Sequence, residues 1–267
     1  MALLIFSHGN SFPASTYGVM TASLKQRGFN VQSIEKLGHD AAFPVTNNWP
    51  HLVSQLAKFT QHSAEKAGES AYLVGHSLGG LLSMLCAAQH PEYVRGVVLL
   101  DAPVIGGWKA AALGFVKRAG LVGRISPGAV SQRRKDCFAN VDEAYAHFKS
   151  KRAFALWDDQ ALRDYVTQGT FAKDGKRFLS FEREIETQIY NTLPSNLESV
   201  LRRNPLRCPV AFIGGLQSNE LRQTGTQLTQ KITQGRMHWL DGTHLFPMEK
   251  PIETAAAIET AIHAFSG

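Results

Sequence analysis

Short apolar runs recur along this chain, and longer segments with helical spacing separate them. The runs cover residues 2–7, 29–35, 71–75, 94–101, 208–214 and 236–240. Strands joined by such long connections pair in parallel through right-handed crossovers. The run at 29–35 also carries Gln32, Ser33 and Glu35, which suit a solvent-exposed edge strand. The pattern therefore predicts an α/β fold with a shortened, mostly parallel sheet of six strands.

One segment, residues 103–205, is too long for a simple crossover. Its periodic stretches predict several helices, near 107–120, 141–149, 158–167 and 193–203. Breaks interrupt the periodicity, one of them at Asp174-Gly175. We therefore expect a core domain formed by residues 1–102 and 206–267, with a helical cap, or lid, inserted at 103–205.

The run at 71–75 ends in Gly75-His-Ser77-Leu-Gly79-Gly, and a helix-forming segment follows at once. A strand, a sharp turn and a helix in this order form a nucleophile elbow, in which small residues flank a strained serine. Ser77 is therefore the candidate nucleophile, and the N–H of Leu78 would point into the same space. A serine hydroxyl is a weak nucleophile alone, so this interpretation requires a base and an acid elsewhere.

The candidate base lies near the C-terminus. His244 follows the run at 236–240 on a glycine-bearing loop, ahead of a final helix predicted over 253–265. A histidine on such a loop can reach a serine at a neighbouring strand end. His238 is the competing histidine, but it lies within the predicted strand, where a structural role is expected.

The loop after the first apolar run supplies a third motif, His8-Gly9-Asn10. Acyl transfer places negative charge on an oxygen, and two backbone N–H groups must stabilise it. Leu78 would supply one of them. Asn10 would supply the other, with Ser11 as the alternative, because Gly9 permits a close approach. We expect His8 to brace the loop through hydrogen bonds.

These three motifs, HGN at 8–10, GHSLGG at 75–80 and GTH at 242–244, resemble those of the α/β-hydrolase superfamily. The resemblance covers nearly the whole chain and implies the α/β-hydrolase fold, with its cap inserted at 103–205. It also implies hydrolysis by a nucleophile, an acid and a histidine, without cofactor or metal. The His-Gly-Asn loop is similar to that of haloalkane dehalogenases, but their nucleophile is an aspartate, and Ser77 excludes that activity.

The acid departs from the commonest family pattern. Ser218 stands where the resemblance implies an aspartate. Asp101 ends the run at 94–101, on the ligand-binding side of a parallel sheet. Some superfamily members place the acid there, so Asp101 is the candidate, and Glu220 is the alternative. Asp101 could also be a structural residue that caps the next turn.

Composition limits the partners of this chain. Of its charged residues, 17 basic and 11 acidic ones lie within 103–205, so the formal charge of +6 resides in the insertion. This charge indicates either a solvated helical surface or attraction of an anionic substrate.

No nucleic-acid-binding motif and no apolar run long enough to span a bilayer is present. Cys86, Cys137 and Cys208 lack metal or redox spacing, which favours a reducing, cytoplasmic location. The oligomeric state stays open.

Together these features predict a cofactor-independent serine hydrolase that cleaves a small carboxylic ester, lactone or thioester, most simply a carboxylesterase of class EC 3.1.1. Hydrolysis of a carbon–carbon bond and perhydrolysis use the same triad and remain alternatives. A non-catalytic ligand-binding protein with this fold is a third hypothesis, and the missing usual acid is the argument for it.

Overall fold

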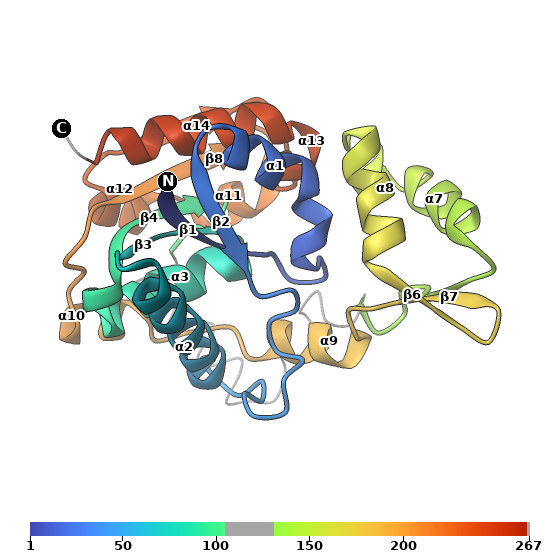
Figure 1. The fold of residues 1–267 in the computed structure, drawn as a ribbon, viewed down its shortest axis with the longest axis horizontal. Helices are drawn as coiled ribbons and strands as arrows, with labels where there is room; N and C mark the ends of the chain where they lie inside the picture. Colours follow the sequence, from blue (N-terminus) through green and yellow to red (C-terminus); the bar gives the residue numbers. More distant parts are fainter. Residues whose placement is uncertain (105–130, 266–267) are drawn as a thin grey trace.

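The computed structural model describes residues 1–104 and 131–265, and a parallel sheet forms its centre (Figure 1). The strand order is β2-β1-β3-β4-β8-β9. The strands are β1 (Ala2–Ser7), β2 (Phe29–Ser33), β3 (Ala71–His76), β4 (Val94–Leu100), β8 (Val210–Gly215) and β9 (Met237–Leu240). Each apolar run thus contains a strand, every pairing is parallel, and β2 lies at one edge.

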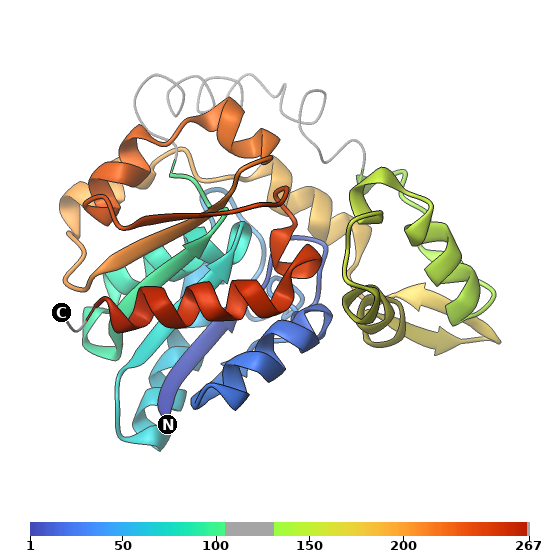
Figure 2. The same ribbon diagram turned by 90° about the horizontal axis from the view of Figure 1, so that it is seen from above.

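Both faces of the sheet are buried, which explains why its strands are continuous apolar runs. In β1, Leu3 and Ile5 join the core on one face, whereas Leu4 and Phe6 join the core on the other. Two pairs of long helices cover these faces (Figure 2). The first pair is α2 (Pro50–Ala67) and α3 (Leu78–Gln89), and the second is α1 (Gly18–Gln26) and α14 (Pro251–His263).

The remaining described elements of the core are short. They are η1 (Ala14–Tyr17), η2 (Pro91–Tyr93), α11 (Asn219–Thr224), α12 (Gln227–Thr233) and α13 (Phe246–Glu249). Helix α10 (Leu197–Arg203), predicted near 193–203 within the insertion, packs against α3 of the core. The final helix begins at Pro251, slightly before the predicted start, because proline is favoured in a first helical turn. None of the described helices combines the length and the apolar character needed to cross a membrane.

The insertion is not purely helical. It contains α7 (Val141–Lys149), η3 (Arg152–Phe154), α8 (Asp159–Gln168) and α9 (Arg183–Asn191), and also strands β5 (Cys137–Phe138), β6 (Thr170–Lys173) and β7 (Lys176–Leu179). The strands form a small antiparallel sheet in the order β5-β7-β6. Neither this sheet nor α9 was predicted from the periodicity. The helix predicted near 107–120 lies outside the described residues.

The small sheet has a recognisable sequence signal. Asp174 and Gly175 join β6 to β7, with φ of 50° and 71°. Positive φ at two consecutive residues is the geometry of a tight hairpin turn, for which Asp-Gly is favoured. The dipeptide therefore turns a hairpin here and does not interrupt a helix.

Aromatic side chains attach the insertion to the core. Phe148, Trp157 and Tyr165 are buried together between α7 and α8. Phe12, from the loop after β1, contacts both Trp157 and Tyr165. Figures 1 and 2 show α7, α8 and the small sheet to one side of the main sheet and its helices. The insertion thus packs against the loop that carries the His-Gly-Asn motif.

Candidate active site

Ser77 lies at the sharp turn between β3 and α3. Its φ of 51° and ψ of −114° are strained for a residue other than glycine. A Cβ at Gly75 would lie 2.2 Å from the backbone of Gly79, and a Cβ at Gly79 would lie 2.1 Å from the Ser7 carbonyl oxygen. Both positions therefore require glycine. The turn has the geometry of a nucleophile elbow.

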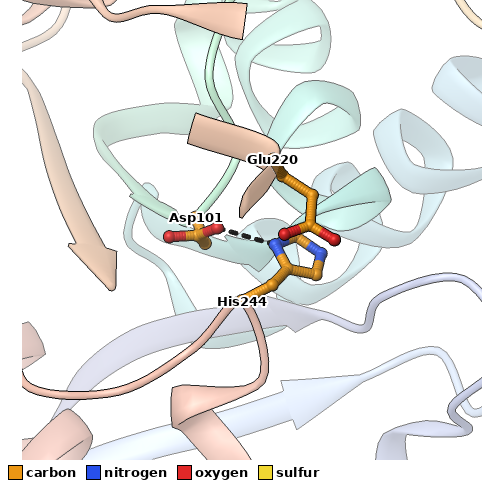
Figure 3. Close-up of side chains that lie close together, drawn as sticks. All are labelled: Asp101, Glu220 and His244. Carbon is orange, nitrogen blue, oxygen red and sulfur yellow. Dashed lines mark hydrogen bonds and ion pairs between the residues drawn. The ribbon is translucent and has the colours of Figure 1, made fainter. Parts of the chain in front are cut away.

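His244 and Asp101 are joined by a hydrogen bond. The two atoms, His244 Nδ1 and Asp101 Oδ2, lie 2.6 Å apart (Figure 3). Because a carboxylate oxygen only accepts, Nδ1 carries the proton and Nε2 is left free to act as a base. His244 and Ser77 line the same cavity. Among the described residues no hydrogen bond joins Ser77 Oγ to His244, a contact that in such sites often tightens when substrate binds.

The carboxylate of Asp101 is fully buried and accepts from three donors. Besides His244, the Ser218 hydroxyl donates to Oδ2 at 2.6 Å, and the Gly215 N–H donates to Oδ1 at 2.8 Å. Ser218 also accepts from the Leu221 N–H and so caps α11. At the position where the family resemblance implies an acid, a serine therefore holds the carboxylate of another strand.

Glu220, the alternative acid, is exposed and lies beside this pair (Figure 3). Its carboxylate is within 4.8 Å of Asp101 and His244, and 3.4 Å from Ser218 Oγ. No hydrogen bond joins Glu220 to His244 in the described part of the chain. The three side chains are of types that bind divalent metals. However, both oxygens of Asp101 are already engaged by protein donors.

The surroundings of His244 change its affinity for a proton. Burial lowers the pKa of His244, but the hydrogen bond and charge of Asp101, with the charges of Glu220 and Glu249, outweigh burial and raise the pKa above 6.5. An imidazolium formed during proton transfer would therefore be stabilised here.

The loop after β1 passes close to the elbow. A Cβ at Gly9 would lie 2.8 Å from His76 Nδ1, so glycine is needed for this approach. Asn10 and Ser11 are both buried and line the cavity. In the described structure the backbone N–H groups of Asn10, Ser11 and Leu78 have no hydrogen-bond partner. They are available to an oxyanion, and the choice of Asn10 over Ser11 stays a prediction.

A buried hydrogen-bond chain links the three motifs. The Gly9 N–H donates to Tyr17 Oη at 3.1 Å, and the Tyr17 hydroxyl donates to His76 Nδ1 at 2.7 Å. His76 Nε2 then donates to the His244 carbonyl at 2.9 Å. Burial lowers the pKa of His76 to about 3, so the ring is neutral and each donor meets an acceptor. Sequence reasoning missed this chain, because only the fold brings Tyr17 beside the elbow.

His8 and His238, the other two histidines considered in the sequence, do not take part in the group formed by Ser77, His244 and Asp101. His8 accepts from the Leu37 N–H at 2.8 Å and donates to the Gly9 carbonyl at 2.8 Å, so it braces the loop. Burial lowers the pKa of His8 to about 4. His238 is on edge strand β9 and is exposed, so it is not the satisfied structural histidine that was expected.

A cavity of about 1040 Å³ opens above Ser77, between the core and the insertion. Core loops and the insertion contribute to its walls, the latter through Phe154, Leu156 and Tyr190. Among the aromatic residues of the insertion, Phe154 lines the cavity, whereas Phe138, Phe148 and Trp157 are buried in the insertion's core. Trp108 lies outside the described residues.

Comparison with known proteins agrees with this geometry. Over 102 residues the chain is 32% identical to a putative non-heme haloperoxidase of Mycobacterium phage D29, a match that covers 38% of this chain and 36% of that protein. Over 169 residues it is 24% identical to the monoglyceride lipase of Rattus norvegicus, covering 58% of this chain and 56% of the lipase. The chain thus spans about a third of one curated relative and just over half of the other.

Solved structures match over the whole fold. E-2-(acetamidomethylene)succinate hydrolase superposes with a TM-score of 0.76 at 23% identity, covering 98% of this chain and 91% of that one. The model of the alpha/beta hydrolase family matches residues 4–257. Because this match covers nearly the whole chain, the chain belongs to the alpha/beta hydrolase family.

Proposed function

We propose that this protein is a serine hydrolase of small carboxylic esters, lactones or thioesters that forms an acyl-enzyme on Ser77. The observation that carries the proposal is the hydrogen bond of 2.6 Å between His244 and the buried Asp101, in the cavity that Ser77 lines. It supports a complete triad in which Asp101 replaces the usual acid. That weakens the hypothesis of a non-catalytic ligand-binding protein.

In the proposed reaction Ser77 Oγ attacks the carbonyl carbon while His244 Nε2 takes its proton. Asp101 keeps the Nδ1 proton in place and stabilises the imidazolium. The N–H of Leu78, at the N-terminus of α3, and the N–H of Asn10 stabilise the oxyanion. His244 then protonates the leaving group, and a water molecule, deprotonated by the same nitrogen, releases the acid.

We also propose that the substrate is anionic. Six charged residues line the cavity, namely Arg134, Arg152, Arg222, Glu186, Glu220 and Glu249. Arg134 pairs with Glu186, and Glu249 accepts from Thr243. In the part of the chain that the structure describes, Arg152 and Arg222 form no ion pair. Among the described residues, two arginines without an ion pair thus share the cavity wall with two carboxylates without one, Glu220 and Glu249. The positive charge that supports the proposal is therefore that of the basic insertion.

Replacing Ser77 with alanine tests the triad. Ser77→Ala should abolish labelling by a fluorophosphonate probe and leave only the residual ~10³–10⁴-fold acceleration over water that triad mutants retain. Ser83→Ala is the matched control, because Ser83 is buried in the same helix and its hydroxyl has no partner among the described residues. A Ser77→Ala protein that keeps a tenth of the wild-type turnover would refute the mechanism.

Perhydrolysis is a second candidate, favoured by the matched segment of the putative non-heme haloperoxidase. In that reaction hydrogen peroxide replaces water as the nucleophile that attacks the acyl-enzyme, and the product is a peracid. Measuring peracid and carboxylic acid formed by the wild type from one ester with hydrogen peroxide would separate the two activities, and Ser77→Ala gives the uncatalysed background.

A further inference from the structure

Helix α9 of the insertion is fastened to the loop that follows β1. The Asn10 side-chain amide donates to the backbone carbonyl of Glu186 at 3.1 Å. The Ser11 hydroxyl donates to the Glu186 carboxylate at 2.5 Å, across a separation of 175 residues in the chain. Two consecutive loop residues are thus held by one residue of the insertion.

Glu186 is built into this position. The residue is 5% exposed, and a buried carboxylate is tolerated only when it is paired and hydrogen-bonded. Arg134 Nη2 lies 2.8 Å from one carboxylate oxygen, and Ser11 donates to the other. Tyr190, one turn further along α9, lines the same cavity as Ser11. The contact is therefore a buried cluster between the core and the insertion, held by one ion pair and by the hydrogen bonds of Asn10 and Ser11.

The loop needs such a contact. Ser11 has a φ of 79°, a left-handed conformation that a serine keeps only when its surroundings hold it. The peptide that carries the Asn10 N–H is held at its Gly9 carbonyl, which accepts from His8 Nδ1 at 2.8 Å and from the Phe12 N–H at 3.3 Å. The next peptide, between Asn10 and Ser11, has no hydrogen bond at its carbonyl or its N–H within the described chain. The two side chains that Glu186 holds, those of Asn10 and Ser11, lie on either side of this second peptide, which carries the Ser11 N–H.

We propose that Glu186 is a positioning residue of the oxyanion hole: it fixes the backbone of Asn10 and Ser11, so that the loop N–H, that of Asn10 or of Ser11, points at the oxyanion before substrate arrives. This inference rests on the proposed function. It means that the hole is complete only while α9 is docked on the core. The insertion then contributes to transition-state stabilisation as well as to the cavity wall.

The test separates positioning from stability and from substrate binding. An oxyanion hole acts in the transition state, so its damage lowers kcat while KM changes little. Glu186→Ala should lower kcat for a p-nitrophenyl ester about 10²-fold, near the effect of losing one oxyanion donor, with KM within about threefold. The affinity for a trifluoromethyl ketone, which forms a tetrahedral adduct with Ser77, should fall by the same factor.

Two further variants complete the design. Glu186→Gln keeps an oxygen that can accept from Ser11, so it should restore most of the lost kcat. Glu184→Ala removes an exposed glutamate on the same helix, outside the cavity, and should leave kcat unchanged. If Glu186→Ala does not fold, Ser11→Ala decides, with an expected loss of about tenfold in kcat and in ketone affinity, because it removes the hydroxyl contact and keeps the Arg134–Glu186 ion pair. Neither variant removes the bond of Asn10 to the backbone carbonyl of residue 186.

Two results would overturn the inference. The first is a kcat within twofold of wild type in a folded Glu186→Ala protein, or in Ser11→Ala if Glu186→Ala does not fold. The other is a variant whose loss appears in KM or melting temperature while its ketone affinity is kept. Neither result would contradict the proposed function, because the wild type would still show turnover that depends on Ser77. A wild-type protein without turnover or labelling at Ser77 would instead overturn the proposed function, and this inference with it.

Discussion

Replacing Asp101 with asparagine tests the assignment of the acid most sharply, because the structure determines how the amide must sit. An asparagine at this position has one oxygen and one NH₂ group. Asp101 Oδ1 accepts from the Gly215 N–H, and Oδ2 accepts from both His244 and Ser218. If the NH₂ replaced Oδ1, two buried donors would face each other, at a cost of about 1–3 kcal/mol.

The other orientation is therefore favoured, with the NH₂ group toward His244 Nδ1. That group would donate to Nδ1 and move the histidine proton to Nε2, the atom that must accept the proton of Ser77. Loss of about 10⁴ in kcat is expected from the wrong tautomer, equivalent to about 5.4 kcal/mol of transition-state stabilisation. Ser218 can rotate its hydroxyl, so the fold should survive.

The assay is steady-state hydrolysis of a p-nitrophenyl ester at saturating substrate, with the melting temperature measured in parallel. Glu220→Gln is the paired variant and should cost less than about tenfold, because Glu220 is exposed and makes no hydrogen bond to His244 in the described structure. If Glu220→Gln loses at least 10³ and Asp101→Asn less than tenfold, then Glu220 is the acid and Asp101 is a structural residue at the end of its strand.

Two other predictions follow from the charges around the site. His244 must be neutral to accept a proton, and its pKa is raised, so kcat/KM should fall with decreasing pH through a midpoint above 6.5. Glu220→Gln removes one of the charges that raise this pKa, and a pH–rate profile that did not move to lower pH would contradict that cause. For an anionic ester, kcat/KM should fall as salt rises, because screening shortens the field to ~8 Å near physiological ionic strength. Equal salt responses for an anionic and a neutral ester would indicate that the basic charge of the insertion is only that of a solvated surface.

The main sheet and the nucleophile could be predicted from the sequence because both depend on local patterns. Strands buried on both faces are continuous apolar runs, so each of the six was visible as one. The elbow needs small residues within two positions of Ser77, a requirement that stays inside one short segment. The histidine loop was likewise marked by its place between a strand and the final helix.

The insertion was harder to predict. Its helices α7 and α8 have clear periodicity, but the small sheet consists of strands of two to four residues, too short for alternation to be recognised. The Asp174-Gly175 dipeptide was the one local signal, and it was interpreted as a helix break.

The contacts that complete the site depend on tertiary structure alone. The pairing of Asp101 with His244 spans 143 residues and arises because β4, β8 and β9 follow one another in the sheet, which brings the segments after these strands to one edge. The same order places Ser218, which follows β8, beside Asp101. The contact of Glu186 with Ser11 requires the insertion to pack on the core. The sequence by itself therefore determined the sheet, the nucleophile and the candidate base, since each is marked within a few neighbouring residues. Only the tertiary structure decided which carboxylate faces His244 and what holds the oxyanion loop, because hydrogen bonds between distant segments leave no periodic trace in the chain.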